Sequence, residues 1–196
     1  MFVTVSVAPV NYPIDFELLK EHLVIEHDQD ETLLDAYIAG VVSQLDPPYG
    51  FLGRSMITQT LQYWVKEFPS GHLLKLPFPP LQSVSSVKYY DDDEVLQTMS
   101  AGDYSVITHT EPGYIELGYD DEEWPTDLSD RKYPIVIEYV AGYGDTYADV
   151  PMGLRLWMMM TIADTYMQRE HLSMSTLNHN RFTLNQIENY RFYFHD

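Results

Sequence analysis

The segment from Pro134 to Pro151 reads PIVIEYVAGYGDTYADVP and connects two strongly apolar parts of the chain. Its first part, PIVIEYV, is rich in β-branched residues and predicts a strand. Gly142 and Gly144 follow, and Pro151 suits the first turn of a helix, where its missing N–H is not needed. Strand, glycine loop and helix is an order in which many proteins bind phosphate, which raises the question of a nucleotide site.

The glycine loop lacks the residues that bind phosphate. A P-loop needs a Lys followed by Ser or Thr after its glycines, and a dinucleotide fingerprint needs a third glycine at the helix start. Neither feature is present, and Asp145, directly after Gly144, would repel a phosphate. We therefore interpret the glycines as residues that permit a sharp turn out of the strand.

The run that begins at Pro151 predicts a helix over about 151–171. Its strongest apolar stripe consists of Leu154, Trp157, Met158, Ile162 and Tyr166. Other apolar side chains cover much of the remaining surface, and a helix of this kind is buried on several sides. Two interpretations stay open: the helix packs against its own bundle and a neighbouring subunit, or it is the central core helix of a monomer.

Two earlier helices are predicted over about 15–24 and 28–46. Asp15 suits the N-cap of the first helix, and Asp28 with Glu31 resembles a capping box at the start of the second. The apolar residues of the second helix recur every three to four residues, which is a strong helical signal. The prolines of DPPYG end this helix, because they remove backbone donors and restrict the preceding residue.

Alternating residues predict a β-rich insertion over about 56–140. MITQTLQYWVKEF, from Met56, has the period-two alternation of a half-buried strand. DDDE, at Asp91–Glu94, lies between two strand-like runs and is interpreted as a hairpin turn. The predicted fold class is α+β: a small helical bundle, made of two N-terminal helices plus a long C-terminal helix, with this insertion and an extended C-terminal tail.

The composition indicates a folded, very acidic protein. The chain has 196 residues, 45% hydrophobic content, a formal net charge of −19 and no cysteine. The charge disfavours nucleic-acid binding, which draws on Lys and Arg, and the missing cysteines exclude disulfides and thiolate chemistry. The N-terminus lacks the basic region of a signal peptide, and the longest apolar run is shorter than the ~20 residues of a membrane span. We therefore expect a soluble protein without a cleaved leader.

No pattern in the sequence points to catalysis, a cofactor or a metal. The seven histidines are scattered, and His22 and His27 are five residues apart, so they do not share a helical face. The acidic clusters at 91–94 and 120–123 lack the alternating ligands and central glycine of a calcium loop. No Gly-x-Ser-x-Gly elbow is present. Paired carboxylates for glycoside cleavage stay possible, but nothing in the sequence selects a pair.

The tail, residues 172–196, differs in character from the rest of the chain. Its side chains carry almost no net charge, and its end is packed with Tyr190, Phe192, Tyr193 and Phe194. Exposed aromatic side chains in such a segment are unfavourable in water and favour association with another surface. We expect it to dock on a partner, and the alternative is that it folds back on its own domain.

The order of the segments resembles the head–tail connector (adaptor) proteins of long-tailed bacteriophages. The similarity is carried by LGRSMITQTLQYWVKEFP, LKLPFPPLQSVSSVKYYDDD, YVAGYGD, VPMGLRLWMMMTIADTYMQRE and the closing NYRFYF. It covers roughly Asp15 to Glu170, and the tail between His171 and Asn189 has little that matches. The resemblance implies a connector domain over 1–171 and a docking tail over 172–196.

The resemblance also implies a structural role in the virion without catalytic activity. We expect a homo-oligomeric ring of about twelve subunits in the neck, between the capsid portal and the tail or a stopper. Viral DNA would pass through the ring during genome packaging and ejection without specific binding. Portal docking falls on Arg181, Phe182, Tyr190, Arg191, Phe192 and Phe194. Candidates for acids that face the channel are Asp91, Asp92, Asp93, Asp120, Asp121 and Glu122.

Two other functions compete with this expectation. A stopper or tail-completion protein would act in the same assembly, but the helical segments argue against its β-barrel-like fold. A carbohydrate-binding or hydrolytic module on a phage tail is suggested by the aromatic residues and the β-rich middle.

Overall fold

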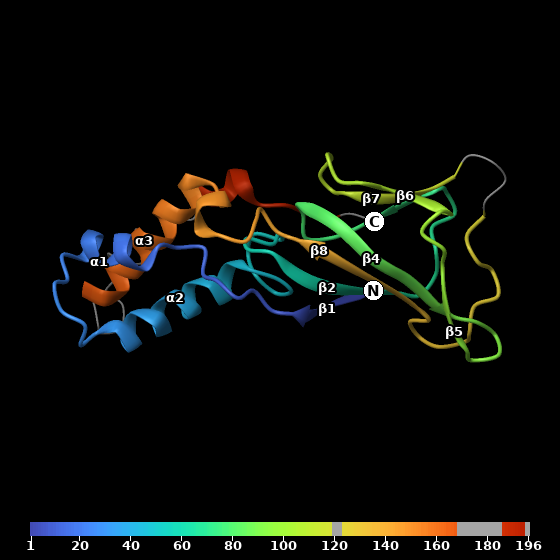
Figure 1. The fold of residues 1–196 in the computed structure, drawn as a ribbon, viewed down its shortest axis with the longest axis horizontal. Helices are drawn as coiled ribbons and strands as arrows, with labels where there is room; N and C mark the ends of the chain where they lie inside the picture. The colour runs from blue at the N-terminus through green and yellow to red at the C-terminus, as the bar shows by residue number, and fades with distance from the viewer. Residues whose placement is uncertain (119–122, 168–185, 195–196) are drawn as a thin grey trace. The chain divides into compact units, whose positions relative to one another are not determined.

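The computed structural model describes residues 1–118, 123–167 and 186–194. Within these ranges the chain has three α-helices and two antiparallel sheets, which confirms the predicted α+β class (Figure 1). The chain divides into two compact units. The β unit comprises residues 1–8 and 58–142 together with Phe194, and the helical unit comprises residues 9–57 and 143–193.

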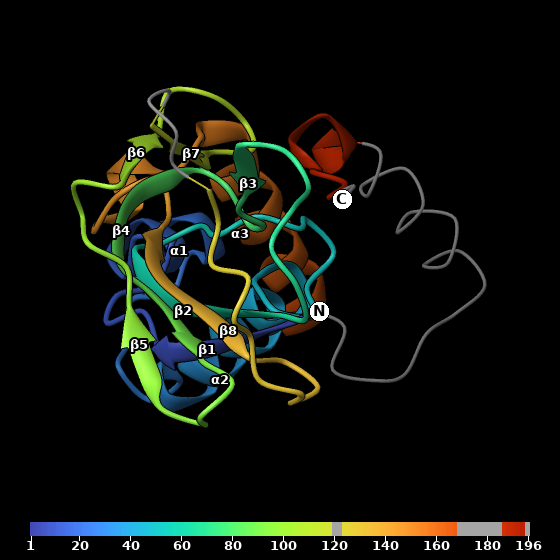
Figure 2. The same cartoon turned by 90° about the vertical axis from the view of Figure 1, so that its right-hand side faces the viewer.

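The β unit is built from eight described strands. They are β1 (Phe2–Val7), β2 (Gln59–Val65), β3 (Leu73–Lys75), β4 (Leu81–Tyr90), β5 (Leu96–Thr98), β6 (Tyr104–Ile107), β7 (Tyr114–Leu117) and β8 (Ile135–Ala141). One sheet has the order β1-β2-β8-β4-β5, and the other has the order β3-β7-β6. Figures 1 and 2 show the small sheet lying over one face of the large one. Their facing side chains form one hydrophobic core.

The central pairing of the large sheet follows from its sequence pattern. β8 pairs with β2 on one side and β4 on the other, with Tyr63 opposite Ile137. Burial alternates strictly along β2, as the period-two pattern predicted. On β8, Tyr139 is fully buried and donates its hydroxyl to the carbonyl oxygen of Pro77 at 2.7 Å. Burial raises the pKa of the Tyr139 hydroxyl well above its ordinary value.

The N-terminal strand is a feature that the sequence analysis did not predict. β1 pairs antiparallel with β2, with Phe2 opposite Trp64, and it forms one edge of the large sheet. The aromatic ring of Phe2 stacks on Trp64 and meets Tyr133 edge-on. The β unit is therefore not made of residues 56–140 alone, because its sheet includes the beginning of the chain.

The helical unit contains α1 (Phe16–Leu23), α2 (Glu31–Leu45) and α3 (Met152–Met167). α3 packs against both α1 and α2 around a shared hydrophobic core. Its completely buried members include Leu19, Leu34, Ile38, Leu154 and Met158. Asp15 caps α1 as predicted, because its carboxylate accepts from the amides of Glu17 and Leu18. In the described residues, no helix is both long enough and apolar enough to cross a membrane.

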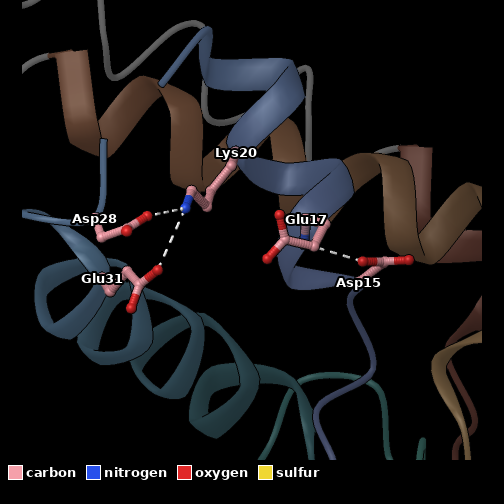
Figure 3. Close-up of polar contacts among 5 residues, drawn as sticks. All are labelled: Asp15, Glu17, Lys20, Asp28 and Glu31. Atoms are coloured by element: carbon pink, nitrogen blue, oxygen red, sulfur yellow. Dashed lines mark hydrogen bonds and ion pairs between the residues drawn. The ribbon is translucent and has the colours of Figure 1, made fainter. Parts of the chain in front are cut away.

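The predicted capping box at the start of α2 is not formed. Figure 3 shows that the carboxylates of Asp28 and Glu31 both turn to the ammonium group of Lys20 on α1, at 2.8 and 3.2 Å. The helix begins at Glu31, and the preceding Asp30 accepts from the Tyr166 hydroxyl of α3. A lysine from another helix outcompetes the local cap, which sequence spacing alone did not reveal.

Candidate functional site

The loop between β8 and α3 is closed by hydrogen bonds to one of its own carboxylates. The Asp149 carboxylate accepts from the amide and the hydroxyl of Thr146, at 3.0 and 2.9 Å. These hydrogen bonds, the amide first, lower the pKa of Asp149. A Cβ atom at Gly144 would lie 2.4 Å from this carboxyl group, and Gly142 has a φ of +141°. The glycines therefore serve the turn, as the sequence predicted.

The predicted apolar stripe of α3 faces the core of the helical unit. Leu154, Met158 and Ile162 are fully buried, Trp157 is almost fully buried, and Tyr166 is half-buried. The opposite side of α3 keeps apolar side chains in the open. Their exposed fractions are 59% for Met152, 47% for Leu156 and 76% for Met167. The described fold of the chain thus buries only part of the apolar surface of this helix.

The described end of the tail is held on the helical unit. Ile187 is fully buried in the core of that unit, directly before the short 3-10 helix η2 (Glu188–Tyr190). Tyr190 packs against the start of α3, where a Cβ atom at Gly153 would lie 2.5 Å from the tyrosine hydroxyl. A glycine at 153 therefore leaves the space in which this tyrosine lies.

The residues after η2 are fixed by backbone and ring contacts. The Phe192 amide donates to the carbonyl oxygen of Leu52 at 2.7 Å. A Cβ atom at Gly53, whose φ is +63°, would lie 2.2 Å from the carbonyl oxygen of Phe192. The Arg191 guanidinium lies over the rings of Phe51 and Tyr193, at 4.2 and 4.5 Å from their centroids. The aromatic end is thus an ordered part of the fold.

The predicted docking residues therefore have contacts within the chain. Tyr190, Arg191 and Phe192 contact the helical unit, and the ring of Phe194 lies edge-on to Tyr63 in the β unit at 6.2 Å. Arg181 and Phe182 lie outside the described residues. Tyr193, which the sequence analysis did not select, has 54% of its surface exposed.

The acidic turn after β4 contains two kinds of carboxylate: some are hydrogen-bonded within the turn, and others are exposed. Asp91 is buried and accepts from the Val95 amide at 2.8 Å and the Gln97 side chain at 2.6 Å. Glu94 has a φ of +64° and accepts from the Ser129 hydroxyl and the Arg131 guanidinium. Hydrogen bonding lowers the pKa values of both carboxyl groups: the largest contribution comes from Gln97 for Asp91, and from Ser129 for Glu94.

Of the six predicted channel acids, two are thereby left exposed in the described structure. They are Asp92 and Asp93, at the tip of the predicted hairpin. Asp91 is used to build the turn, and Asp120, Asp121 and Glu122 lie outside the described residues. Nowhere in the described ranges do three or more His, Asp or Glu side chains gather in a way that could hold a metal ion.

The β unit also contains an open pocket of about 730 Å³ that the sequence analysis missed. Tyr63, Phe68, Leu74 and Phe194 contribute apolar surface to it, and Lys66, Glu67 and Lys75 are its charged lining residues. Its lining ranges from Met1 to Phe194. No local sequence signal brings residues this far apart together, so only the folded chain reveals the pocket.

Solved structures share this fold over its whole length. A chain in the neck of an empty gene transfer agent (GTA) particle with C6 symmetry is similar at a TM-score of 0.78 and 16% identity. A chain in the virion of a native GTA particle reaches 0.72, and one in the neck of a native GTA particle with C12 symmetry reaches 0.71, both at 17% identity. Each similarity covers 100% of this chain and 98% of the other.

Sequence comparisons add no assignment. No protein-family profile matches the chain, and no curated protein matches it by sequence. What the solved structures share with this chain is the fold.

Proposed function

We propose that this chain is a neck protein of a tailed, phage-like particle, where it forms the adaptor ring between the portal and the tail. The observation that carries the proposal is the full-length structural similarity to chains in the necks of GTA particles. The connector-like order of sequence motifs supports the same role independently of the fold. The role is structural, and it requires no bond-making or bond-breaking step.

The ring is proposed to continue the DNA channel without holding DNA. A net charge of −19 on each subunit gives the assembled wall a strongly negative field, which opposes phosphate contacts. The exposed acids Asp92 and Asp93 are candidates for this wall. Asp91 is not, because its carboxylate is buried and already hydrogen-bonded.

We also propose that the C-terminal segment contacts the portal. The body of the subunit holds this segment in an ordered conformation, which lowers the entropy cost of presenting it to a partner. Tyr193 and the half-buried Arg191 and Phe192 offer the surface for such a contact. The remaining tail candidates, Arg181 and Phe182, lie outside the described residues.

Electron microscopy of the full-length chain, alone and mixed with portal oligomers of the same particle, tests the proposal. We expect rings of about twelve subunits seated coaxially on the portal. A chain that stays off the portal, or that binds it as a single copy, would overturn the adaptor role. Rings that attach only to the tail side would favour the stopper or tail-completion role instead.

The tail contact needs a point variant and not a deletion. Removing residues 173–196 also removes the buried Ile187, so lost binding would be explained equally well by unfolding. Tyr193→Ser removes a ring that is 54% exposed, and because this ring also contacts Arg191 and its hydroxyl donates to Glu188, circular dichroism must show that the variant keeps its fold. Tyr49→Ser, at a residue that is 95% exposed, controls for the loss of a surface tyrosine. We expect weaker portal binding for Tyr193→Ser alone. Equal affinities of both variants and the wild type would refute a portal contact at Tyr193.

A further inference from the structure

The hairpin tip between β4 and β5 is both acidic and apolar. Asp92 and Asp93 are exposed, and they are followed by Val95 and Leu96, which are 52% and 46% exposed. Exposed apolar side chains beside unpaired acids are not needed to close a hairpin turn. The tip therefore offers both apolar and acidic groups for contact with another surface.

The turn beneath this tip is held rigidly. The Asp91 carboxylate fixes Val95 and Gln97, and Glu94 is fixed by Ser129 and Arg131. The Arg131 guanidinium also lies 3.6 Å from the centroid of the Tyr90 ring. A tip whose supporting side chains are already ordered loses little conformational entropy when it binds.

The pocket of the β unit has the complementary character. Tyr63, Phe68, Leu74 and Phe194 provide apolar lining, and the charged side chains in the lining are the exposed Lys66, Glu67 and Lys75, two positive against one negative. The ion pairs of the described residues engage neither lysine. On a chain with 30 acidic and 11 basic residues, a lining in which two unpaired lysines outnumber the single acid Glu67 is a local exception that favours an acidic occupant.

The tip and the pocket also lie beside open strand edges. β5 ends the large sheet, and β3 ends the small sheet, so among the described strands each has only one neighbour. Open edges readily accept a further strand or peptide. Figure 2 shows β5 on one side of the β unit and the N-terminus, where Met1 lines the pocket, on the other. The tip therefore does not reach the pocket of its own subunit.

We propose that the β4–β5 tip of one subunit inserts into the lysine-bordered pocket of the next subunit. Val95 and Leu96 meet the aromatic lining, and Asp92 and Asp93 lie beside Lys66 and Lys75. Because two different patches of the same chain meet, the contact is heterologous and propagates into a closed ring. In this arrangement Asp92 and Asp93 lie between subunits and not on the channel wall. The inference rests on the proposed ring and specifies how its subunits join.

A cysteine pair tests this contact cleanly, because the chain has no cysteine of its own. Val95→Cys places a thiol on the tip, and Leu73→Cys places one at the exposed edge of the pocket. After oxidation of rings on the portal, we expect the double variant to give a ladder of oligomers beyond the dimer on a non-reducing gel. Each single variant stops at the dimer or below. A double variant without the ladder, on rings that form normally, overturns the inference and leaves the adaptor role intact.

Charge reversal provides a second, independent readout. Like charges are placed opposite each other by either of two double variants, Asp92→Lys with Asp93→Lys or Lys66→Glu with Lys75→Glu. Each double variant is expected to raise the protein concentration for half-maximal ring assembly by about tenfold or more. Combining all four changes in one chain restores attraction and is expected to recover assembly. Glu26→Lys with Asp35→Lys controls for the change in net charge made by the two aspartate variants, and the fourfold variant leaves the net charge of the chain unchanged. Assembly unaffected by either pair refutes the contact, and a wild type that forms no ring on the portal refutes both proposals.

Discussion

At the scale of single residues, the core position of Trp157 can be tested directly. Its side chain is 6% exposed in the helical core, whereas Leu156 on the same helix is 47% exposed. Trp157→Ala is expected to lower the free energy of unfolding by about 3–5 kcal/mol, because it removes a large buried ring and leaves a cavity. Leu156→Ala should change it by only about 0.5 kcal/mol. Urea titration followed by circular dichroism measures both, and a similar loss in the two variants would contradict the packing of α3.

Gly153 and Tyr190 allow a test of how the C-terminal segment is seated. Alanine is a better helix former than glycine, by up to about 1 kcal/mol, yet a Cβ atom at Gly153 would meet the Tyr190 hydroxyl at 2.5 Å. We expect Gly153→Ala to destabilise the wild type by about 1–3 kcal/mol through overpacking. In a Tyr190→Phe background the nearest remaining ring atoms are at 3.2 Å, so the cost should largely disappear. A double-mutant cycle with no coupling between the two changes would show that Tyr190 is not held there.

Single residues also show where sequence reasoning worked. The N-cap role of Asp15 and the turn role of Gly144 depend on neighbours within a few residues, and local patterns carry that information. The partner of Asp28 is Lys20 on another helix, and the partner of Gly153 is Tyr190 near the other end of the helical unit's sequence. Such choices depend on the fold, so local spacing could not reveal them.

At the scale of elements, the ion pairs of Lys20 connect α1 to the start of α2. Hydrogen bonding to Lys20 lowers the pKa of Asp28 below 3.8, and hydrogen bonding to Asp28 raises the pKa of Lys20 above 10.5. The Asp28 contribution to stability is therefore present above pH 3.8 and lost as the pH falls through its lowered pKa. The Lys20 contribution is present below pH 10.5 and lost as the pH rises through its raised pKa.

We predict that Lys20→Met moves the pKa of Asp28 upwards, towards its ordinary value. The apolar side chain keeps the stem of the lysine and removes the ammonium group that holds the carboxylate. An NMR titration of the Asp28 carboxyl carbon measures the change, and Lys132→Met controls for the loss of one positive charge elsewhere. An unchanged Asp28 titration in Lys20→Met would refute the link between the two helices.

The elements themselves were predicted unequally. The described parts of the three helices and the strand β2 lie within the ranges that the sequence predicted, but α2 begins at Glu31 and not near residue 28. Residues 168–171 of the predicted last helix lie outside the described residues. β1 was not predicted, although FVTVSV is rich in β-branched residues, because its six residues are separated by more than fifty from β2, the strand with which it pairs. The short edge strands β3 and β5 have three residues each, which is too short for a periodic signal. The pocket beside β3 was missed because its lining joins residues from both ends of the chain, which no local pattern connects.

At the scale of the whole molecule, charge sets the conditions of assembly. The chain carries a formal net charge of −19, so copies of it in the proposed ring would repel one another strongly, whereas the proposed contact contributes only a few local attractions. Raising the ionic strength from about 0.01 M to 1 M shortens the Debye length from about 30 Å to 3 Å. We predict that ring assembly strengthens over this range, because long-range repulsion is screened more than the partly desolvated pairs. Mass photometry across a salt series measures this, and assembly that weakens steadily with salt would contradict it.

One double variant distinguishes the two roles considered for Asp92 and Asp93, which are lining the channel and joining neighbouring subunits. Asp92→Asn with Asp93→Asn keeps the size of the side chains and removes two negative charges from the tip. If these acids line the channel, rings assemble like the wild type and the passage of DNA slows, because the wall repels phosphate less. If they lie between subunits, as we infer, assembly requires a higher protein concentration, and the rings that do form pass DNA at the wild-type rate. We expect the second result, with a smaller loss than for the lysine variants, since neutral side chains remove an attraction without adding repulsion. Assembly titrations measure the protein concentration that the ring requires, and ejection kinetics on the same particles measure the rate of DNA passage. Slowed ejection from fully assembled rings would show that these acids line the channel and do not lie between subunits.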